Sequence, residues 1–250
     1  MFPYHDENET LRTPIVTIGI IIACIAAWVL VQGGGSEEAA ARSVCNFGLI
    51  PGELTESVRP GTGFRMSREL VCLTDAGPQY LNVLTSMFMH GGWMHLLGNM
   101  WFLWIFGDNV EERLGTIRFV IFYLVVGAVG ALAQAFSTPG STLPMIGASG
   151  AIAGVLGGYV MLYPRAKVVT FVAIPLLWHV RDVAAWIFLG IWFLGQFLIP
   201  SGSGVAWMAH VGGFLAGLGL IRLLAKTRPQ SPTASPDVEY LPPPRRNQSW

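Results

Sequence analysis

Six long apolar stretches divide the chain, and they restrict its possible folds more than any other feature. A bilayer core about 30 Å thick is crossed by roughly 20 apolar residues in a helix, and each stretch approaches that length. Hydrophobic residues make up 52% of the 250 residues and charged residues only 12%, with a mean hydropathy of +0.52. This composition excludes an ordinary soluble domain. We therefore expect an all-α membrane protein, a bundle of six transmembrane helices over residues 15–31, 94–106, 117–136, 145–163, 183–199 and 205–225.

The first two stretches need separate comment. Residues 15–31 follow an acidic segment rather than a cationic one, which favours a retained span over a cleaved leader. Residues 94–106 are the shortest stretch, but residues 84–90 before them are also largely apolar. We expect the second helix to begin within that preceding segment.

Positive charges predict the orientation, because Lys and Arg gather in cytoplasmic connections. They occur between the second and third stretches, between the fourth and fifth and after the sixth, while 137–144 and 200–204 carry no charge. Both termini are thus expected in the cytoplasm of a cell, as for a multi-pass protein of a bacterial inner membrane. The domains expected are a cytoplasmic segment 1–14, a membrane domain 15–225 with a large, partly structured outer connection at 32–79, and a disordered tail 226–250.

The three cysteines lie in two parts of the chain. Cys24 lies in the first stretch, whereas Cys45 and Cys72 lie in the outer connection and can pair if it faces an oxidising compartment. Two unpaired thiols are equally compatible with the spacing.

The formal net charge is +0, so the basic face that phosphate binding needs is missing and no nucleic-acid partner is expected.

Polar side chains suited to catalysis converge at one depth of the predicted bundle. The second, fourth and sixth helices run in the same direction, and their first turns carry His95, Ser149 and His210, with His90 and Asn99 close to the first of these. A serine and a histidine are costly at membrane depth, which favours a functional pairing. We predict that Ser149 is a nucleophile and His210 its general base.

Rows of small residues would let the two helices approach closely. Ser149, Ala153 and Gly157 follow one another at helical spacing, and so do His210, Gly213 and Gly217. Gly150, Gly154 and Gly158 form a second row. Such rows also serve simply as packing devices in membrane helices, so by themselves they do not indicate catalysis.

The surroundings of Ser149 are suited to stabilising an oxyanion. A helix start leaves free backbone N–H groups beside Ser149, and Gly147 lets substrate and backbone approach. His95 and Asn99 share a helix face and can both donate hydrogen bonds to a developing negative charge. The apolar stretches hold no carboxylate near His210, so a Ser/His dyad is expected, with the ring held by Trp207, Phe214 or neighbouring side chains.

These residues resemble the motifs of the rhomboid family of intramembrane serine proteases. The second-span motif is matched by residues 90–99, HGGWMHLLGN, the nucleophile motif by Gly147-Ala148-Ser149-Gly150, and the histidine motif by residues 209–213, AHVGG. Gly107 and residues 111–115, EERLG, are similar to the turn that follows the second span in bacterial members.

The resemblance implies a rhomboid-like bundle of six helices, with Ser149 attacking a peptide bond and His210 as base. It implies oxyanion stabilisation by Ser149, His95 and Asn99, support from His90, Gly147 and Gly150, and no metal or organic cofactor. The expected partners are the lipid bilayer and single-pass or multi-pass membrane proteins, cleaved near the outer ends of their transmembrane segments where helix-breaking residues expose the backbone.

Two departures from the family pattern stand out. Ala153 occupies a position where many members place an aromatic residue beneath the catalytic histidine, so His210 is expected to be less firmly held. Tyr80-Leu81 replaces a Trp-Arg pair, which puts the usual anchoring of the outer loop in doubt. Two rival functions stay open: a catalytically inactive rhomboid-like binding protein, and a small transporter, although internal repeats and intramembrane carboxylates are not evident.

Overall fold

The computed structural model describes residues 1–8, 10–66, 70–174, 177–200 and 203–225. It is predominantly helical, as expected, and a helix lies in each of the six apolar stretches. These helices are α1 (Ile15–Ala26), which continues as the π-helical turn η1 (Ala27–Val31), α5 (Trp93–Leu114), α6 (Thr116–Ser137), α7 (Ser149–Leu162), α8 (Ala185–Gln196) and α9 (Trp207–Leu224). The predicted tail at 226–250 lies outside the described residues.

Helix lengths differ widely across the bundle. Among the described helices, α6 and α9 are each long and apolar enough to cross a membrane. The stretch 15–31, α7 and α8 are shorter apolar helices, and α5 is long but ends in a charged segment. The arrangement of six complete spans therefore stays a proposal.

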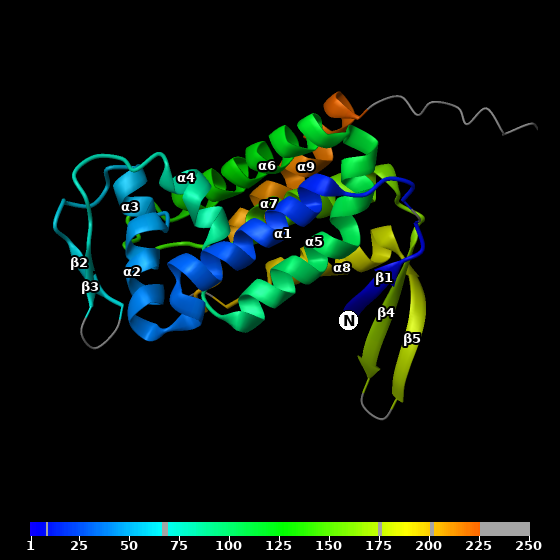
Figure 1. Cartoon of the computed structure of the whole chain (residues 1–250), viewed down its shortest axis with the longest axis horizontal. Coiled ribbons are helices and arrows are strands. Elements are labelled where there is room, and N and C mark those ends of the chain that lie inside the picture. Colours follow the sequence, from blue (N-terminus) through cyan, green and yellow to red (C-terminus); the bar gives the residue numbers. More distant parts are fainter. Residues whose placement is uncertain (9, 67–69, 175–176, 201–202, 226–250) are drawn as a thin grey trace, which may run out of the picture.

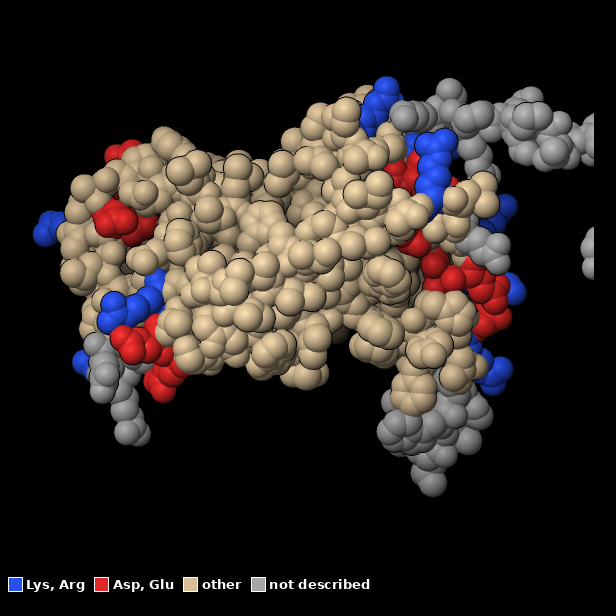
Figure 2. All heavy atoms as spheres, viewed as in Figure 1, with Lys and Arg blue, Asp and Glu red and all other residues tan. Residues whose placement is uncertain are grey.

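Helix α7 lies at the centre of the packing, with every residue from Gly150 to Tyr159 buried, and contacts α9, α6 and α5. Helix α9 also packs against α6, and α5 against α1 (Figure 1). The buried core between these helices is aliphatic and aromatic, with Phe106, Phe122, Tyr159 and Leu156 fully enclosed. On the face shown in Figure 2, Lys, Arg, Asp and Glu gather over the two ends of the molecule and leave the middle free of charge. This distribution suits an apolar belt between two aqueous surfaces.

The second helix begins later than expected. Residues 82–88 form a separate short helix, α4 (Asn82–Thr85), and a 3-10 turn, η3 (Ser86–Phe88), and α5 starts only at Trp93. Extended backbone at Gly92, the residue before α5, separates the two. At its other end α5 runs on to Leu114, so the segment from Gly107 is helical rather than a turn, and the chain reverses at Gly115, whose φ is +78°.

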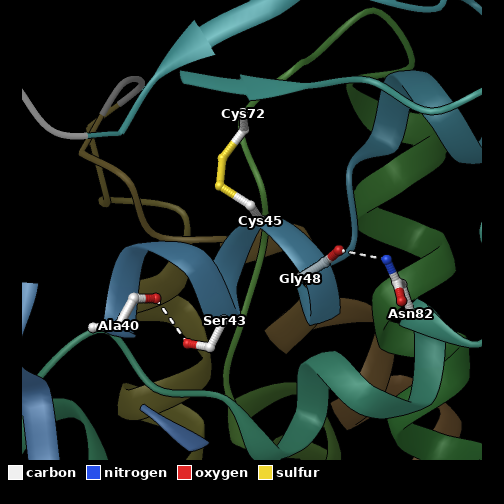
Figure 3. The surroundings of a disulfide bond; sticks show 6 residues. All are labelled: Ala40, Ser43, Cys45, Gly48, Cys72 and Asn82. Carbon is white, nitrogen blue, oxygen red and sulfur yellow. Dashed lines mark hydrogen bonds between the residues drawn. A yellow bond between two sulfur atoms is a disulfide. The ribbon is translucent and has the colours of Figure 1, made fainter. Parts of the chain in front are cut away.

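The connection at 32–79 is partly structured, as expected. After a glycine turn, η2 (Gly33–Gly35), it contains α2 (Glu37–Phe47), α3 (Pro51–Leu54) and an antiparallel pair of strands, β2 (Gly63–Arg65) and β3 (Val71–Leu73). A disulfide joins Cys45 on α2 to Cys72 on β3, which resolves the two alternatives for these thiols (Figure 3). The remaining cysteine, Cys24, is buried and free.

The structured connection at 32–79, called the cap from here on, is anchored to the bundle although Tyr80-Leu81 stands in place of the Trp-Arg pair. Asn82 Nδ2 donates to the Gly48 carbonyl at 3.0 Å, as Figure 3 shows, and Thr85 Oγ1 donates to the Phe47 carbonyl at 2.9 Å. Leu49 and Met145 exchange two backbone hydrogen bonds, which ties the cap to the loop before Ser149. The doubt about the anchoring of the outer loop is thereby answered for this chain.

A three-stranded antiparallel sheet at the opposite end was not expected. Strand β4 (Lys167–Ile174) lies between β1 (Phe2–Asp6) and β5 (Leu177–Ala184). The fifth apolar stretch consequently begins as strand, with Val183 and Ala184 in β5, and the helix starts at Ala185. The sheet contacts α5, where Trp101 Nε1 donates to the Pro3 carbonyl at 2.8 Å and the Trp101 ring stacks on Phe2.

Side chains also join the first helix and the N-terminal strand to this end of the bundle. Glu111 on α5 accepts hydrogen bonds from the backbone N–H groups of Val16 and Thr17 at 2.9 and 2.8 Å, and so caps the start of α1. Tyr159 on α7 donates to the Asp6 carboxylate at 2.5 Å. Strand β1 is therefore held against the bundle.

Candidate active site

Ser149 is the first residue of α7, as the sequence predicted. The loop before it enters the bundle at Gly147, whose φ of +125° is rarely accessible to other residues and whose N–H donates to the Ser86 carbonyl at 2.9 Å. The first N–H groups of a helix have no partner within it, so those of Ser149 and Gly150 remain available beside the Ser149 hydroxyl.

The structure brings Ser149 and His210 together across two helices. The Ser149 Oγ lies 2.8 Å from Nε2 of His210, which projects from the first turn of α9. This is the geometry in which an imidazole accepts a hydroxyl proton. The side chains come from positions 61 residues apart, so only the packing of α7 on α9 creates the pair.

Glycine is what permits this approach. A β-carbon at Gly213 would collide with the Gly150 carbonyl, and one at Gly217 would collide with the Gly154 carbonyl. A β-carbon at Gly157 would meet the Phe214 backbone. Both predicted rows on α7 thus take part in the contact, and the two backbones touch directly below the Ser149–His210 pair.

His95 lies beside the same serine. Its ring packs against Gly147, and its Nδ1 accepts a hydrogen bond from the Gly91 N–H at 3.2 Å. A neutral imidazole carries one N–H, so the proton resides on Nε2, the edge that faces Gly147. The ring therefore presents a hydrogen-bond donor toward Gly147, two residues before the nucleophile, a position suited to an oxyanion donor.

Asn99 and His90 are placed differently. Asn99 is buried, and its Nδ2 donates to the His95 carbonyl at 2.9 Å, one turn back on α5. His90 is fully buried, its ring lies 5.2 Å from that of His95, and its Nδ1 lies 3.2 Å from the Phe88 carbonyl. Gln32 exchanges two hydrogen bonds with the His90 backbone, both at 2.8 Å, a support that the sequence did not suggest.

The His210 ring is held by residues that the sequence analysis did not single out. Gln196 Oε1 lies 2.7 Å from Nδ1, and the ring of Trp192 lies 6.1 Å from the imidazole. Trp207 and Phe214 instead contact the rings of Phe197 and Trp192. An amide in the otherwise apolar stretch 183–199 was the available signal, because buried polar groups in membrane helices require partners.

A small cavity adjoins Ser149. The residues that line it come from η3, from α6, from the loop before α7, from the first turn of α7 and from around the start of α9, and most have small side chains. Its lining includes Met87, Gly127, Ala131, Met145, Gly150 and Ala209. Ser149 therefore borders a space that can hold water.

Comparison with known proteins identifies a family that matches this chain. The model of the family described as "Rhomboid domain" matches residues 77–227, which include Ser149, His210, His95 and Asn99. RHOMBOID-like protein 4 of Arabidopsis thaliana is 34% identical over 157 residues, covering 59% of this chain and 35% of that protein.

Two further relatives extend the comparison. RHOMBOID-like protein 6, mitochondrial, of Arabidopsis thaliana is 30% identical over 243 residues, covering 90% of this chain and 73% of that protein. Rhomboid protease GluP of Bacillus subtilis is 33% identical over 141 residues, covering 56% of this chain and 25% of that protein. The chain spans about a third of the length of the first relative and a quarter of the last. With a family model matched over more than half of its residues, the chain belongs to the rhomboid family of membrane-embedded proteins.

Proposed function

We propose that this chain is an intramembrane serine endopeptidase that hydrolyses peptide bonds in or near transmembrane segments of other membrane proteins. The distance of 2.8 Å between Ser149 Oγ and His210 Nε2 carries the proposal. Family membership supports it, since a relative is named as a protease. No carboxylate is hydrogen-bonded to His210 among the described residues, so the pair acts as a dyad.

In the first step His210 Nε2 takes the hydroxyl proton while Ser149 Oγ attacks the scissile carbonyl carbon. The C–N bond then breaks as the imidazolium gives that proton to the leaving amine, and the acyl group stays on Ser149. In the second step water attacks the ester and gives a proton to His210, and the imidazolium returns that proton to Ser149 Oγ as the acyl bond breaks. The products are a carboxylic acid, an amine and the original serine.

The negative charge on the carbonyl oxygen needs donors close to Ser149. The N–H groups at the start of α7 and the Nε2–H of His95 are suited to this role, and Asn99 retains a second amide hydrogen besides the one given to the His95 carbonyl. A preorganised donor of this kind contributes on the order of 3 kcal/mol to transition-state stabilisation. Gly147 and Gly150 support the site by leaving room for the substrate backbone.

The short α7 supports cleavage within the bilayer. Its 14 residues span about 21 Å, less than the roughly 30 Å of a hydrocarbon core, so Ser149 would lie below the membrane surface. A peptide bond within an intact helix is not accessible to a nucleophile, so segments with helix-breaking residues near their outer ends are the expected substrates.

The membrane arrangement completes the proposal. Six spans in residues 15–225 would place the disulfide-linked cap on the outer side and both termini in the cytoplasm, with the chain in a bacterial inner membrane. The disulfide supports an oxidising exterior for the cap. No metal or organic cofactor takes part in the proposed chemistry.

Cleavage of a model transmembrane substrate by purified protein in vesicles tests the proposal. Wild type should cleave it and Ser149→Ala should not, while Ser137→Ala at the exposed end of α6 serves as a matched control and should cleave normally. Equal cleavage by wild type and Ser149→Ala would refute the dyad. Substrate binding without cleavage by any variant would favour a binding protein, and solute flux without cleavage a transporter.

A further inference from the structure

The best-defined contact that the proposed mechanism leaves unused lies on the far side of the His210 ring. Gln196 is the last residue of α8 and is 7% exposed. Its amide bridges two groups: Nε2 donates to the Trp192 carbonyl at 2.9 Å, and Oε1 lies 2.7 Å from His210 Nδ1. A buried amide with both ends paired is well suited to orienting its partners.

The chemistry of these groups determines the direction of every hydrogen bond. A backbone carbonyl can only accept, so the NH2 group of Gln196 must face Trp192 and the amide oxygen must face His210. The amide oxygen also can only accept, so His210 Nδ1 must carry the proton. The opposite amide orientation would set two carbonyl oxygens against each other at 2.9 Å.

We infer that Gln196 is a positioning residue that holds neutral His210 in the Nδ1–H tautomer and keeps the Nε2 lone pair on the Ser149 hydroxyl. The catalytic consequence of this role rests on the proposed function. The bonds run in one direction, from Ser149 to His210 to Gln196 to the Trp192 carbonyl.

The contacts of Gln196 and Trp192 with His210 take the place of the aromatic residue that is missing at Ala153. The ring that lies near His210 comes from Trp192, which is four residues before Gln196 and thus on the same face of α8. One face of α8 therefore supplies both the ring contact and the hydrogen-bond acceptor. Since the amide is neutral, it orients the imidazole without the desolvation cost of a buried carboxylate. The expectation that His210 is loosely held is not supported.

The tautomer can be measured directly by ¹⁵N NMR of histidine-labelled full-length protein in micelles, at a pH where histidine is neutral. The His210→Ala spectrum assigns the signals. In wild type, His210 should show a protonated Nδ1 and an unprotonated Nε2. Gln196→Met keeps the volume and removes the acceptor, so the Nε2–H tautomer should become populated. Gln196→Glu retains an acceptor oxygen toward Nδ1, so the Nδ1–H tautomer should persist, while its second oxygen loses the bond to the Trp192 carbonyl and lowers stability.

Gln134→Met is the matched control. Gln134 on α6 accepts a hydrogen bond at 3.0 Å from the N–H of Met208. Met208 lies on the same helix as His210, so this bond contacts α9 at its backbone and not at the His210 ring. This variant should leave the His210 signals unchanged. A wild-type protein with protonated Nε2, an unchanged tautomer in Gln196→Met, or equal changes in both Met variants would overturn the inference. The wild-type measurement decides the matter even if Gln196→Met does not fold.

Cleavage assays then separate this inference from the proposed function. With protease activity present, kcat of Gln196→Met should fall about tenfold, which corresponds to about 1.4 kcal/mol of transition-state stabilisation, with KM little changed. The loss of kcat should be smaller in Gln196→Glu, which keeps the acceptor for Nδ1. If no variant cleaves but the tautomer follows Gln196, the proposed function fails and the positioning role stands. A kcat of Gln196→Met within twofold of wild type would refute the catalytic consequence.

Discussion

The imidazole of His95 lies against the backbone of Gly147, and a β-carbon at that glycine would sit 2.8 Å from both Cε1 and Nε2 of the ring. We predict that Gly147→Ala displaces His95 and strains the loop at a φ of +125°, lowering kcat at least tenfold. Gly98→Ala is the control, because a β-carbon there meets nothing within 4 Å, and it should cleave normally. Comparable losses in the two variants would contradict the role assigned to the Gly147 contact.

The contact between α7 and α9 gives a second prediction. Gly217→Ala places a methyl group against the Gly154 carbonyl, so it should push the helices apart and lower the free energy of unfolding by about 1–3 kcal/mol. Gly219→Ala, on the same helix with open space around it, should be neutral or stabilising by up to about 1 kcal/mol. Thermal unfolding in detergent compares them, and equal midpoints would argue against direct backbone contact.

The raised pKa of Asp6 predicts that the stability of the fold depends on pH. Burial raises the pKa of Asp6 from 3.8 to about 6, with a hydrogen bond from Tyr159 opposing the rise and the nearby Asp108 adding to it. Between these two values the folded state binds more protons than the unfolded state, so this group makes stability fall as pH rises from about 4 to 6. Above about pH 6 the Asp6 carboxylate is ionised in the folded state, and its full destabilising effect on the fold is present.

The variant Asp6→Asn tests this dependence. Its amide oxygen can still accept the Tyr159 hydroxyl, but it carries no charge. Thermal midpoints should therefore be higher than those of wild type above about pH 6, and the difference should shrink toward pH 4. A difference that grew on acidification would show that the carboxylate is stabilised, not destabilised, by its surroundings.

The disulfide predicts a selective effect on the cap. Cys45 and Cys72 are 27 residues apart, and closing a loop of that size stabilises a fold by about 3.5 kcal/mol in the chain-entropy model. Replacing both with alanine should speed proteolysis of the cap, while cleavage of a model substrate persists because His95, Ser149 and His210 lie outside it. Unchanged proteolysis would indicate that Asn82, Thr85 and Leu49 suffice to hold the cap.

Much of the helical arrangement could be predicted because it depends on local pattern. Apolar runs marked where α1, α5, α6, α7, α8 and α9 lie, and the small residues around Ser149 and His210 indicated a close approach. The predicted start of the second helix was wrong because apolar character continues through residues 84–90, whereas the helical backbone is interrupted at Gly91 and Gly92. Hydropathy does not register that break.

The remaining features depend on contacts between distant parts of the chain. Strand β1 pairs with β4 across more than 160 residues, and neither segment alone indicates its partner. Glu111 caps α1 from another helix. Gln196 could be recognised as an isolated amide, but whether it meets His210 depends on the rotation of α8 about its axis.

The sequence by itself determined that this chain enters a membrane as helices and that small residues beside Ser149 and His210 would allow two helices to approach closely, because hydropathy and side-chain size are properties of single residues. Only the tertiary structure decided which group holds the histidine, how the cap is anchored and that a sheet joins the N-terminus to the bundle. Those outcomes depend on hydrogen bonds whose direction and distance exist only after the helices have packed.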